Sequence, residues 1–273
     1  MSVELLSRSD DFGSAWAANE AILEGCKKGY VIRNVSCMAV APWIKEGAEE
    51  LKHCREIDVG IHLTLNSEWD GVKWGPLSEA GKTAGVTDEA GYFFSSQKQF
   101  VNRGIDLDKV MKEFDMQLDI LFRLGLHVIY ADTHMAPELF IPGLFSCLSE
   151  WTEKKGLINA GKYYSLPEQM IPEYTDYDEK YLDSVDKWLN LLCENNQYFY
   201  ITHPAKKSEE LQLFYNEDNP KGKIPKERNQ EYPSVSSPLW LTWEKKYNIK
   251  FLRYSEAKEQ LHSEETLRRI IVG

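Results

Sequence analysis

The stretch "DLDKVMKEFDMQLDILFRLGLHVIYADTH", Asp106 to His134, joins two different hydrophobic patterns. In its first part apolar residues recur every three or four positions, which is the spacing of an amphipathic helix. The residues of that apolar face are Val110, Phe114, Leu118 and Leu121. The second part, "HVIYADTH", is a short run of β-branched and aromatic residues, typical of a buried strand. The stretch therefore predicts a helix that leads directly into a strand, the repeating unit of an α/β fold.

The same alternation of strand and helix extends over most of the chain. Further candidate strands are "VELL" from Val3, "VSCMAV" from Val35, "DVGIHLTL" from Asp58, "LINAGK" from Leu157, "YFYITHP" from Tyr198 and "IKFLRY" from Ile249. Most are separated by segments with helical spacing, such as "SAWAANEAILEGCKKG" from Ser14. This alternation predicts a mainly parallel sheet with helical crossovers, and about seven units favour a closed or nearly closed (β/α) barrel. We expect one domain over residues 1–273.

Composition and charge narrow the class of protein. A length of 273 residues, with 42% hydrophobic and 27% charged residues, is ordinary for a soluble enzyme, and no apolar run approaches the ~20 residues that span a bilayer. The net charge of −11 opposes a nucleic-acid partner, which requires clustered Lys and Arg. The beginning of the chain does not resemble a secretory signal, and the five cysteines are scattered without a Cys-x-x-Cys pair. We therefore expect a cytoplasmic protein with reduced thiols and no membrane partner.

Two long irregular stretches interrupt the alternation, residues 66–104 and residues 205–236. Both contain Gly or Pro together with aromatic residues, among them Trp69 and Trp74 in the first stretch. Loops of this length in a compact domain are usually functional or disordered. Both follow the carboxyl ends of predicted strands, where barrel enzymes build their active sites.

Polar residues with metal-binding or acid–base chemistry stand at the predicted strand ends. They are Asp10 and Asp11 at the first strand, His62 in the third, Asp132 and His134 at the fourth, and His203 at the sixth. Alternation along "GIHLTLN" places Gly60, His62 and Thr64 on one face, so the imidazole can point into the barrel mouth. Asp11, His62 and His134 would then converge, and one carboxylate with two imidazoles forms a plausible catalytic metal site.

Each of these residues has a structural alternative. Asp10 or Asp11 could cap the helix that begins near Ser14. His62 and His134, taken singly, also fit hydrogen-bonded core histidines, and His203, which precedes a proline, fits an ordinary loop position. The coincidence of three ligand types at three strand ends favours the metal site over packing alone.

Five motifs, in order along the chain, carry a resemblance to a known family. "SDDFG" with "ANEAILEG", "GIHLTL", "ADTHM", "THPA" and "KERNQEYPSVSSP" resemble the corresponding signatures of the YdjC-like carbohydrate deacetylases. The resemblance implies an irregular (β/α) barrel related to polysaccharide deacetylases, with a divalent metal on Asp11, His62 and His134 and with Asp10 as the catalytic base. It also implies acetylated sugars, including chitin-derived oligosaccharides, as substrates, and a homodimer. Met135, Ala136 and Pro137 follow His134 where many members carry further histidines, so the substrate is less well defined than the metal.

These residues fit the hydrolysis of an N-acetyl group. His203 is the candidate acid for the leaving nitrogen, or else a donor to the oxyanion. Asp132 is a candidate to orient a ligand histidine or to contact substrate. Arg228 and Glu231 would position sugar hydroxyls or a phosphate, or else pair with each other as a structural ion bridge. Trp69 and Trp74 would stack on sugar faces or anchor their loop in the core.

The identity of the metal and the reaction class stay open at this level. The donor set favours zinc over magnesium, although members of the family are often described with magnesium. One competing function is another enzyme on the same scaffold, either a sugar isomerase or a glycoside hydrolase. A glycoside hydrolase needs a pair of carboxylates, and Asp10 with Asp132 is the one pair that we can nominate. The other competing function is a non-catalytic glycan-binding protein.

Overall fold

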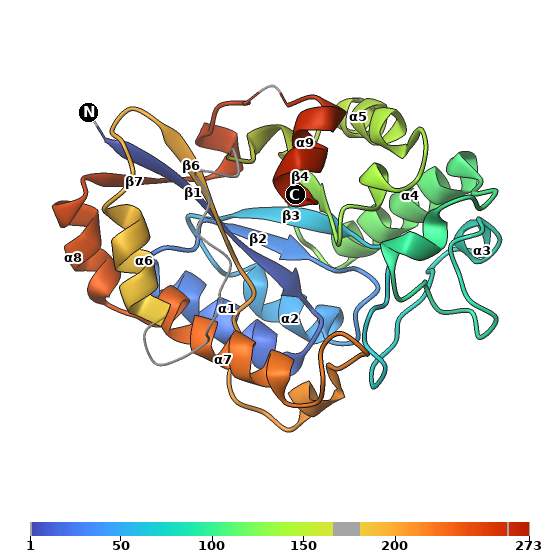
Figure 1. Ribbon diagram of the computed structural model, residues 1–273, viewed down its shortest axis with the longest axis horizontal. Coiled ribbons are helices and arrows are strands. Elements are labelled where there is room, and N and C mark those ends of the chain that lie inside the picture. Colours follow the sequence, from blue (N-terminus) through green and yellow to red (C-terminus); the bar gives the residue numbers. More distant parts are fainter. Residues whose placement is uncertain (1, 166–180, 261, 273) are drawn as a thin grey trace.

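Seven parallel strands form one sheet in the computed structural model, which describes residues 2–165, 181–260 and 262–272 (Figure 1). The strands are β1 (Val3–Phe12), β2 (Asn34–Cys37), β3 (Asp58–Leu63), β4 (Val128–Thr133), β5 (Ile158–Asn159), β6 (Gln197–Thr202) and β7 (Ile249–Leu252). Their order is β5-β4-β3-β2-β1-β6, and β7 also pairs with β1. The predicted number, position and parallel direction of the strands are therefore confirmed. Within the described ranges no pairing joins β5 to β6, so the sheet is a half-barrel.

The long strand β1 organises the sheet because it has three neighbours. One edge pairs with β6, while the other edge pairs first with β7, over Val3–Leu6, and then with β2 from Arg8 onward. The buried side chain of Asn34 fills the fork between β7 and β2. Its amide nitrogen donates to the carbonyl oxygens of Ser7, at 2.7 Å, and Leu252, at 3.1 Å, so the side chain satisfies two backbone carbonyls where the two strands separate.

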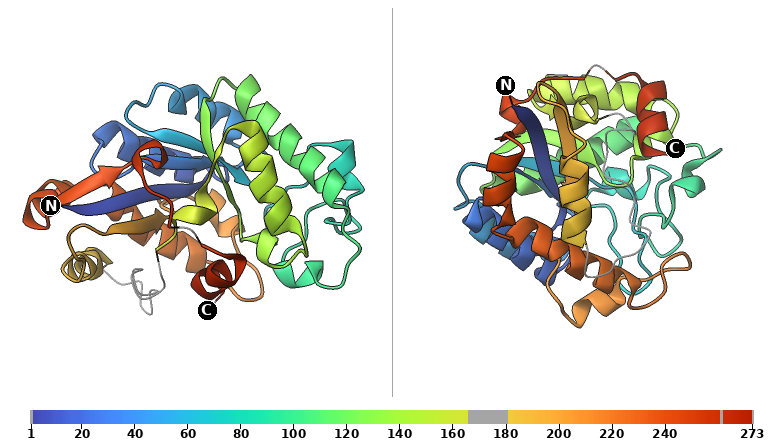
Figure 2. Two further views of the ribbon diagram at one scale, coloured as in Figure 1. Left: turned by 90° about the horizontal axis from the view of Figure 1, so that it is seen from above. Right: turned by 60° about the vertical axis from the view of Figure 1, so that its left-hand side comes forward.

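Helices cover most of the outer face of the half-barrel. The helices of the described residues are α1 (Trp16–Lys28), α2 (Ile44–Leu51), α3 (Glu79–Lys82), α4 (Leu107–Arg123), α5 (Leu144–Lys155), α6 (Tyr181–Leu189), α7 (Lys223–Ser236), α8 (Leu239–Lys246) and α9 (Glu264–Ile271). Helix α9 differs from the others, because its Leu267 packs against Ala136 and Leu139 after β4 and not in the main core. Helix α1 contacts α2 and α7, whereas α4 contacts α5 on the opposite flank of the sheet (Figures 1 and 2). Helix α4 begins after Asp106, whose carboxylate accepts from the backbone N–H of Lys109, and its predicted apolar face is buried. In the described part of the chain, no helix has the length and apolarity needed to cross a membrane.

The two faces of the sheet have different contents. Residues such as Leu5, Val35 and Ile61 point outward into the core beneath the helices. The inner face carries a smaller aromatic cluster that includes Tyr130 and, on β6, Phe199. The ring of Tyr130 requires a glycine on the neighbouring strand, because a Cβ atom at Gly60 would lie only 2.2 Å from that ring. Alternation along the strands therefore separates an apolar outer layer from an inner layer that becomes polar toward the carboxyl ends.

Helix α7 corrects the expectation that residues 205–236 are irregular. Its buried residues recur with helical spacing, at Ile224, Arg228, Glu231 and Val235. Two of these four residues are charged, so the sequence lacks the helical spacing of apolar residues that would predict a helix here. Pro225 lies in the first turn, where a backbone N–H would form no hydrogen bond within the helix, so the proline is tolerated. Pro233 lies in the last turn.

Candidate functional site

A break in the regular path of β1 aims two neighbouring carboxylates at the inside of the half-barrel. Adjacent residues of a regular strand point to opposite faces, but Asp11 has a left-handed backbone with a φ of 59°, and the pairing with β2 shifts between Ser9 and Phe12. Helix α1 begins only after Ala15, without a side-chain cap. The alternative in which Asp10 or Asp11 caps this helix is therefore wrong.

Asp11 and the two histidines predicted as metal ligands meet at the carboxyl ends of β1, β3 and β4. The Oδ1 atom of Asp11 lies 3.5 Å from Nε2 of His62 and 3.3 Å from Nδ1 of His134, and those two nitrogens are 3.3 Å apart. All three side chains are buried. Among the described residues, no hydrogen-bond donor reaches Asp11 Oδ1. One carboxylate oxygen and two imidazole nitrogens thus face a common point, as the sequence predicts; the metal itself stays a prediction.

The outward nitrogen of each imidazole is held by a carboxylate. His62 Nδ1 lies 2.8 Å from Oδ1 of Asp132, and His134 Nε2 lies 3.0 Å from Oε2 of Glu68. Such contacts fix the ring orientation and leave the inner nitrogen free to bind a metal, which is the usual arrangement around metal-bound histidines. The orienting role expected for Asp132 thus has a geometric basis. Glu68 was not predicted, because it stands at the start of a long loop whose return to the site is not visible in the sequence.

The electrostatics of this cluster favour a bound cation. Burial alone would lower the pKa of His62, but Asp132 and Asp11 outweigh burial and raise it to about 9. Burial is likewise overcome at His134, where Glu68 and Asp11 raise the pKa to about 10. Burial would raise the pKa of Asp11, yet the guanidinium of Arg228 holds it well below its ordinary value. The carboxylates therefore draw positive charge, whether protons or a metal ion, to the imidazoles.

A second group of possible ligands, Asp10, His62 and Asp132, fits a metal less well. The guanidinium of Arg8 already lies between the two carboxylates, with Nε 2.6 Å from Asp10 Oδ1 and Nη1 2.7 Å from Asp132 Oδ2. A further bond from Nη2 to Asp10 Oδ2 at 2.7 Å makes the contact with Asp10 bidentate. Arg8 was not predicted as a site residue, although it shares its strand face with Asp10. A metal placed among these residues would face a fixed positive charge.

Arg228 and Glu231 both reach the site from α7 but do not pair with each other. Arg228 Nη2 lies 2.5 Å from Oδ2 of Asp11, and Glu231 accepts the backbone N–H of His203. The predicted alternative of an ion bridge between Arg228 and Glu231 is therefore wrong. Arg228 occupies the oxygen of Asp11 that points away from the histidines and leaves Oδ1 available.

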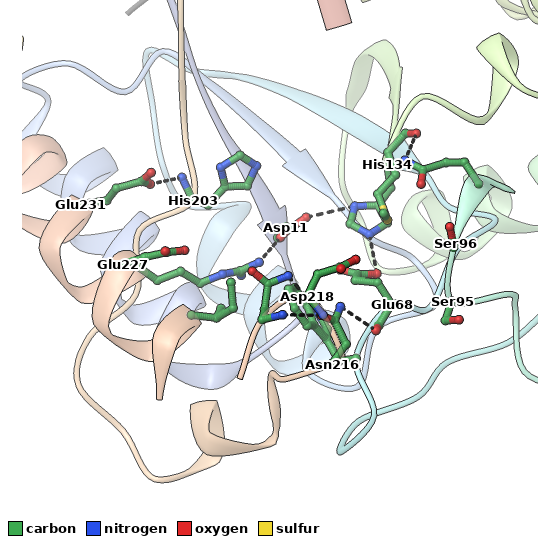
Figure 3. Close-up of a pocket in the computed structure, with 16 residues that line it drawn as sticks. Asp11, Glu68, Ser95, Ser96, His134, His203, Asn216, Asp218, Glu227 and Glu231 are labelled. Carbon is green, nitrogen blue, oxygen red and sulfur yellow. Dashed lines mark hydrogen bonds and ion pairs between the residues drawn. The ribbon is translucent and has the colours of Figure 1, made fainter. Parts of the chain in front are cut away.

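A pocket of about 380 Å³ opens above this cluster (Figure 3). Its lining includes Asp11, His134 and His203, together with residues of both long loops. The two loops are joined by backbone contacts: the N–H of Asp70 donates to the carbonyl of Tyr215 at 2.8 Å. The pocket therefore has walls from segments that are far apart in the sequence, and it ends at the candidate metal ligands.

The two tryptophans expected near the substrate have different positions. Trp69 lines the pocket. Trp74 is 4% exposed and is absent from the described lining; its indole N–H donates to the carbonyl of Asn66 at 2.6 Å. For Trp74, the structure supports the alternative of a loop anchor over stacking on a sugar. Asp132 is also absent from the described lining, and its carboxylate contacts His62 and Arg8.

These features define a class of protein: an α/β half-barrel with an Asp-His-His cluster at the carboxyl ends of its strands. A family model described as "YdjC-like protein" matches residues 4–246, and the chain therefore belongs to the YdjC-like family.

Two curated relatives agree with this assignment. A carbohydrate deacetylase of Thermoanaerobacter pseudethanolicus is 29% identical over 130 residues, which cover 48% of this chain and 49% of the relative. One from Listeria welshimeri is 28% identical over 157 residues, covering 57% and 59%. The matched segments thus span about half of these relatives.

Two solved structures share the fold. A protein of Enterococcus faecalis named for cleavage of cellobiose phosphate has a TM-score of 0.67 at 19% identity, covering 93% of this chain and 98% of that one. The catalytic domain of a peptidoglycan N-acetylglucosamine deacetylase from Eubacterium rectale has a TM-score of 0.53 at 11% identity, covering 95% and 92%.

Proposed function

We propose that the protein is a metal-dependent carbohydrate deacetylase, which hydrolyses the acetamide of an N-acetylated sugar or chito-oligosaccharide to acetate and an amine. The observation that carries the proposal is the convergence of Asp11, His62 and His134 at the floor of a pocket, with a carboxylate on the outward nitrogen of each ring. The names of the relatives in the YdjC-like family support the same reaction.

Asp11, His62 and His134 would hold one divalent ion. Two nitrogen donors and one carboxylate suit zinc, or another transition ion, better than magnesium. When bound, the ion would polarise the acetyl carbonyl and make a neighbouring water more acidic. Asp11 Oδ1 is buried, forms no hydrogen bond with the described residues and faces the inner nitrogen of both imidazoles, and this observation fits such an ion most directly.

Asp10 is the proposed general base. Its carboxylate is oriented by two bonds from Arg8, and it takes the proton of the attacking water. On the same side, His203 Nε2 lies 4.0 Å from Asp10 Oδ2, and its side chain is 43% exposed toward the pocket. These contacts support His203 as the group that donates a proton to the leaving nitrogen, and its backbone N–H is held by Glu231.

The glycoside hydrolase alternative is disfavoured by the same contacts. A glycosidase needs two carboxyl groups facing each other across a glycosidic bond. Asp10 and Asp132 instead share the guanidinium of Arg8, which fills the space between them.

Acetate release from N-acetylated chito-oligosaccharides, measured with the zinc-loaded protein, tests the proposal. We expect acetate with the wild type, and loss of turnover in His62→Ala and Asp10→Asn. His53→Ala is a matched control, because His53 is exposed beyond α2 and outside the pocket lining. Chain shortening without acetate in mass spectra, or unchanged acetate release in His62→Ala, would contradict the proposal.

A further inference from the structure

Two cysteines that are far apart in the sequence meet in a second pocket, outside the candidate active site. Cys26 lies in the last turn of α1, and Cys54 follows the end of α2, where its backbone N–H donates to the carbonyl of Leu51 at 2.9 Å. Helices α1 and α2 contact each other on the outer face of the sheet (Figure 1). Both thiols line a pocket of about 460 Å³ at these helix ends.

This pocket lies at the edge of the sheet opposite to the candidate metal ligands. Helix α1 leads from the carboxyl end of β1 to the amino end of β2, and α2 ends shortly before β3 begins. The strands are parallel, so their amino ends share one edge of the sheet, while Asp11, His62 and His134 lie at the other. A reaction of the two thiols can therefore be measured without reference to the proposed deacetylase function.

The two thiols have different environments. Cys26 is 7% exposed, whereas Cys54 is half-buried. The thiol of Cys26 donates a hydrogen bond to Cys54, and this bond together with burial raises the pKa of Cys26 well above its ordinary value. The same bond lowers the pKa of Cys54 against the effect of burial, and the ammonium group of Lys27 lowers it further. Cys54 is thus the better nucleophile of the two at neutral pH, because the thiolate is the reactive form.

The charges around the pocket also favour a thiolate. Among the described lining residues, the fully charged side chains are three cations and one carboxylate, which belong to Lys27, Arg33, Arg55 and Glu56. This local excess of positive charge contrasts with the net charge of −11 for the whole chain. Arg33 is held in place, since its Nη1 donates to the carbonyl of Ile32 at 3.0 Å and its guanidinium lies over the ring of Phe251. A positive field stabilises the anionic form of Cys54.

We propose that Cys54 is a peroxide-reactive thiol and that Cys26 then forms a disulfide with it. In the first step the Cys54 thiolate attacks hydrogen peroxide: an S–O bond forms, the O–O bond breaks, and the departing hydroxide takes a proton from solvent to become water. In the second step the sulfur of Cys26 attacks the sulfur of Cys54: the S–S bond forms, the S–O bond breaks, and the hydroxyl leaves as water with the proton of Cys26. Two thiols are thereby oxidised by two electrons, and one peroxide is reduced to two waters.

Peptide mapping of the wild type after treatment with hydrogen peroxide tests the proposal. The remaining thiols are blocked with N-ethylmaleimide before digestion, so that disulfides do not exchange. We expect one bond, between the peptides that carry Cys26 and Cys54, the loss of two hydrogen atoms from the intact mass, and recovery of both thiols with dithiothreitol. A disulfide from Cys26 to Cys37 of β2, oxidation of the exposed Cys193 without a bond between Cys26 and Cys54, or no oxidation at all overturns the inference.

Variants of single cysteines separate the two steps. Cys54→Ser should abolish the disulfide, whereas Cys193→Ser is the matched control and should leave it unchanged, because Cys193 is absent from the described lining of this pocket. In Cys26→Ala, Cys54 should still react with peroxide, more slowly because it loses its hydrogen bond, and dimedone should trap its sulfenic acid. Thermal unfolding confirms that each variant is folded. Dimedone on Cys193 in place of Cys54 would overturn the inference.

The rate at which iodoacetamide alkylates Cys54 near neutral pH tests the role of the positive charge. Lys27→Gln should slow this rate by roughly twofold to threefold; the effect is small because Lys27 is exposed and shares its charge with Glu50 at 3.2 Å. Lys52→Gln is the control, because Lys52 follows the same helix α2 but pairs with Glu49 and is absent from the described lining. An equal rate in Lys27→Gln and the wild type overturns the assignment of Cys54 as the thiolate.

Discussion

Removal of the carboxylate of Glu68 should weaken metal binding although Glu68 is not itself a predicted ligand. Its Oε2 lies 3.0 Å from Nε2 of His134, and the other nitrogen of that ring faces Asp11 Oδ1 at 3.3 Å. Both groups are buried, so water does not replace the carboxylate at low cost. In Glu68→Ala, His134 loses the contact that fixes which nitrogen carries the proton and how the ring is turned.

The expected loss of metal affinity in Glu68→Ala follows from the number of histidines that lose a carboxylate partner. One of the two imidazoles loses its carboxylate, while His62 keeps Asp132 at 2.8 Å. Loss of one such contact weakens metal binding by about 10- to 100-fold, or roughly 1.4 to 2.7 kcal/mol. Glu68→Gln keeps the size and an acceptor oxygen but loses the charge, so its effect should be smaller.

Isothermal titration of zinc into the chelator-treated protein measures this effect. Glu79→Gln is the control, because the Glu79 side chain is 89% exposed and contacts only Lys82 among the ion pairs of the described chain. A zinc affinity in Glu68→Ala within twofold of the wild type would refute the reasoning, since His134 would then need no outer partner.

Three further predictions concern pH and stability. The metal-free protein should become less stable as pH rises from about 6.5 to 10. In the folded protein the pKa values of His62 and His134 are raised from 6.5 to about 9 and about 10, so the stabilisation is complete below the pKa of the unfolded chain and is lost above the pKa values of the folded protein. Urea unfolding at pH 6.5 and pH 10 checks this, and equal stability at both would contradict it. Gly60→Ala should destabilise the fold by about 1 to 3 kcal/mol, because its Cβ would meet the ring of Tyr130. Gly104→Ala is the control and should leave the stability unchanged, because the space around Gly104 is open. Equal unfolding midpoints for the two variants would contradict the packing argument. Arg8→Met should cost about 3 to 5 kcal/mol by leaving two buried carboxylates without their cation, and a loss below 1 kcal/mol in chemical denaturation would show that the cation is dispensable.

The strands and α4 were predictable because their signals are local. Each strand lies in or beside a short run rich in apolar, β-branched or aromatic residues, and the apolar period of α4 begins beside a capping Asp106. Helix α7 was missed because two of its buried positions are occupied by Arg228 and Glu231, which contact Asp11 of β1 and His203 just after β6. A charged residue that is buried for a distant partner has the same appearance in a sequence as one in water.

The candidate metal ligands were predictable from the sequence, but the residues and the backbone geometry that hold them in position were not. Asp11, His62 and His134 stand at recognisable strand ends. The bulge that turns Asp11 depends on the pairing of β1 with β2, and the contact of Glu68 with His134 depends on the path of a loop of nearly forty residues. The contact of Arg8 with Asp10 and Asp132 could be predicted only if the inner face of β1 were known. The homodimer and the cytoplasmic location stay predictions.

The central claim is that Asp11, His62 and His134 hold one divalent ion. Anomalous diffraction at the zinc absorption edge, from crystals of the zinc-loaded protein, measures this directly. We predict a single strong peak about 2.0 to 2.2 Å from Asp11 Oδ1, His62 Nε2 and His134 Nδ1. A peak between Asp10 and Asp132, or no peak at this cluster at saturating zinc, would contradict the account.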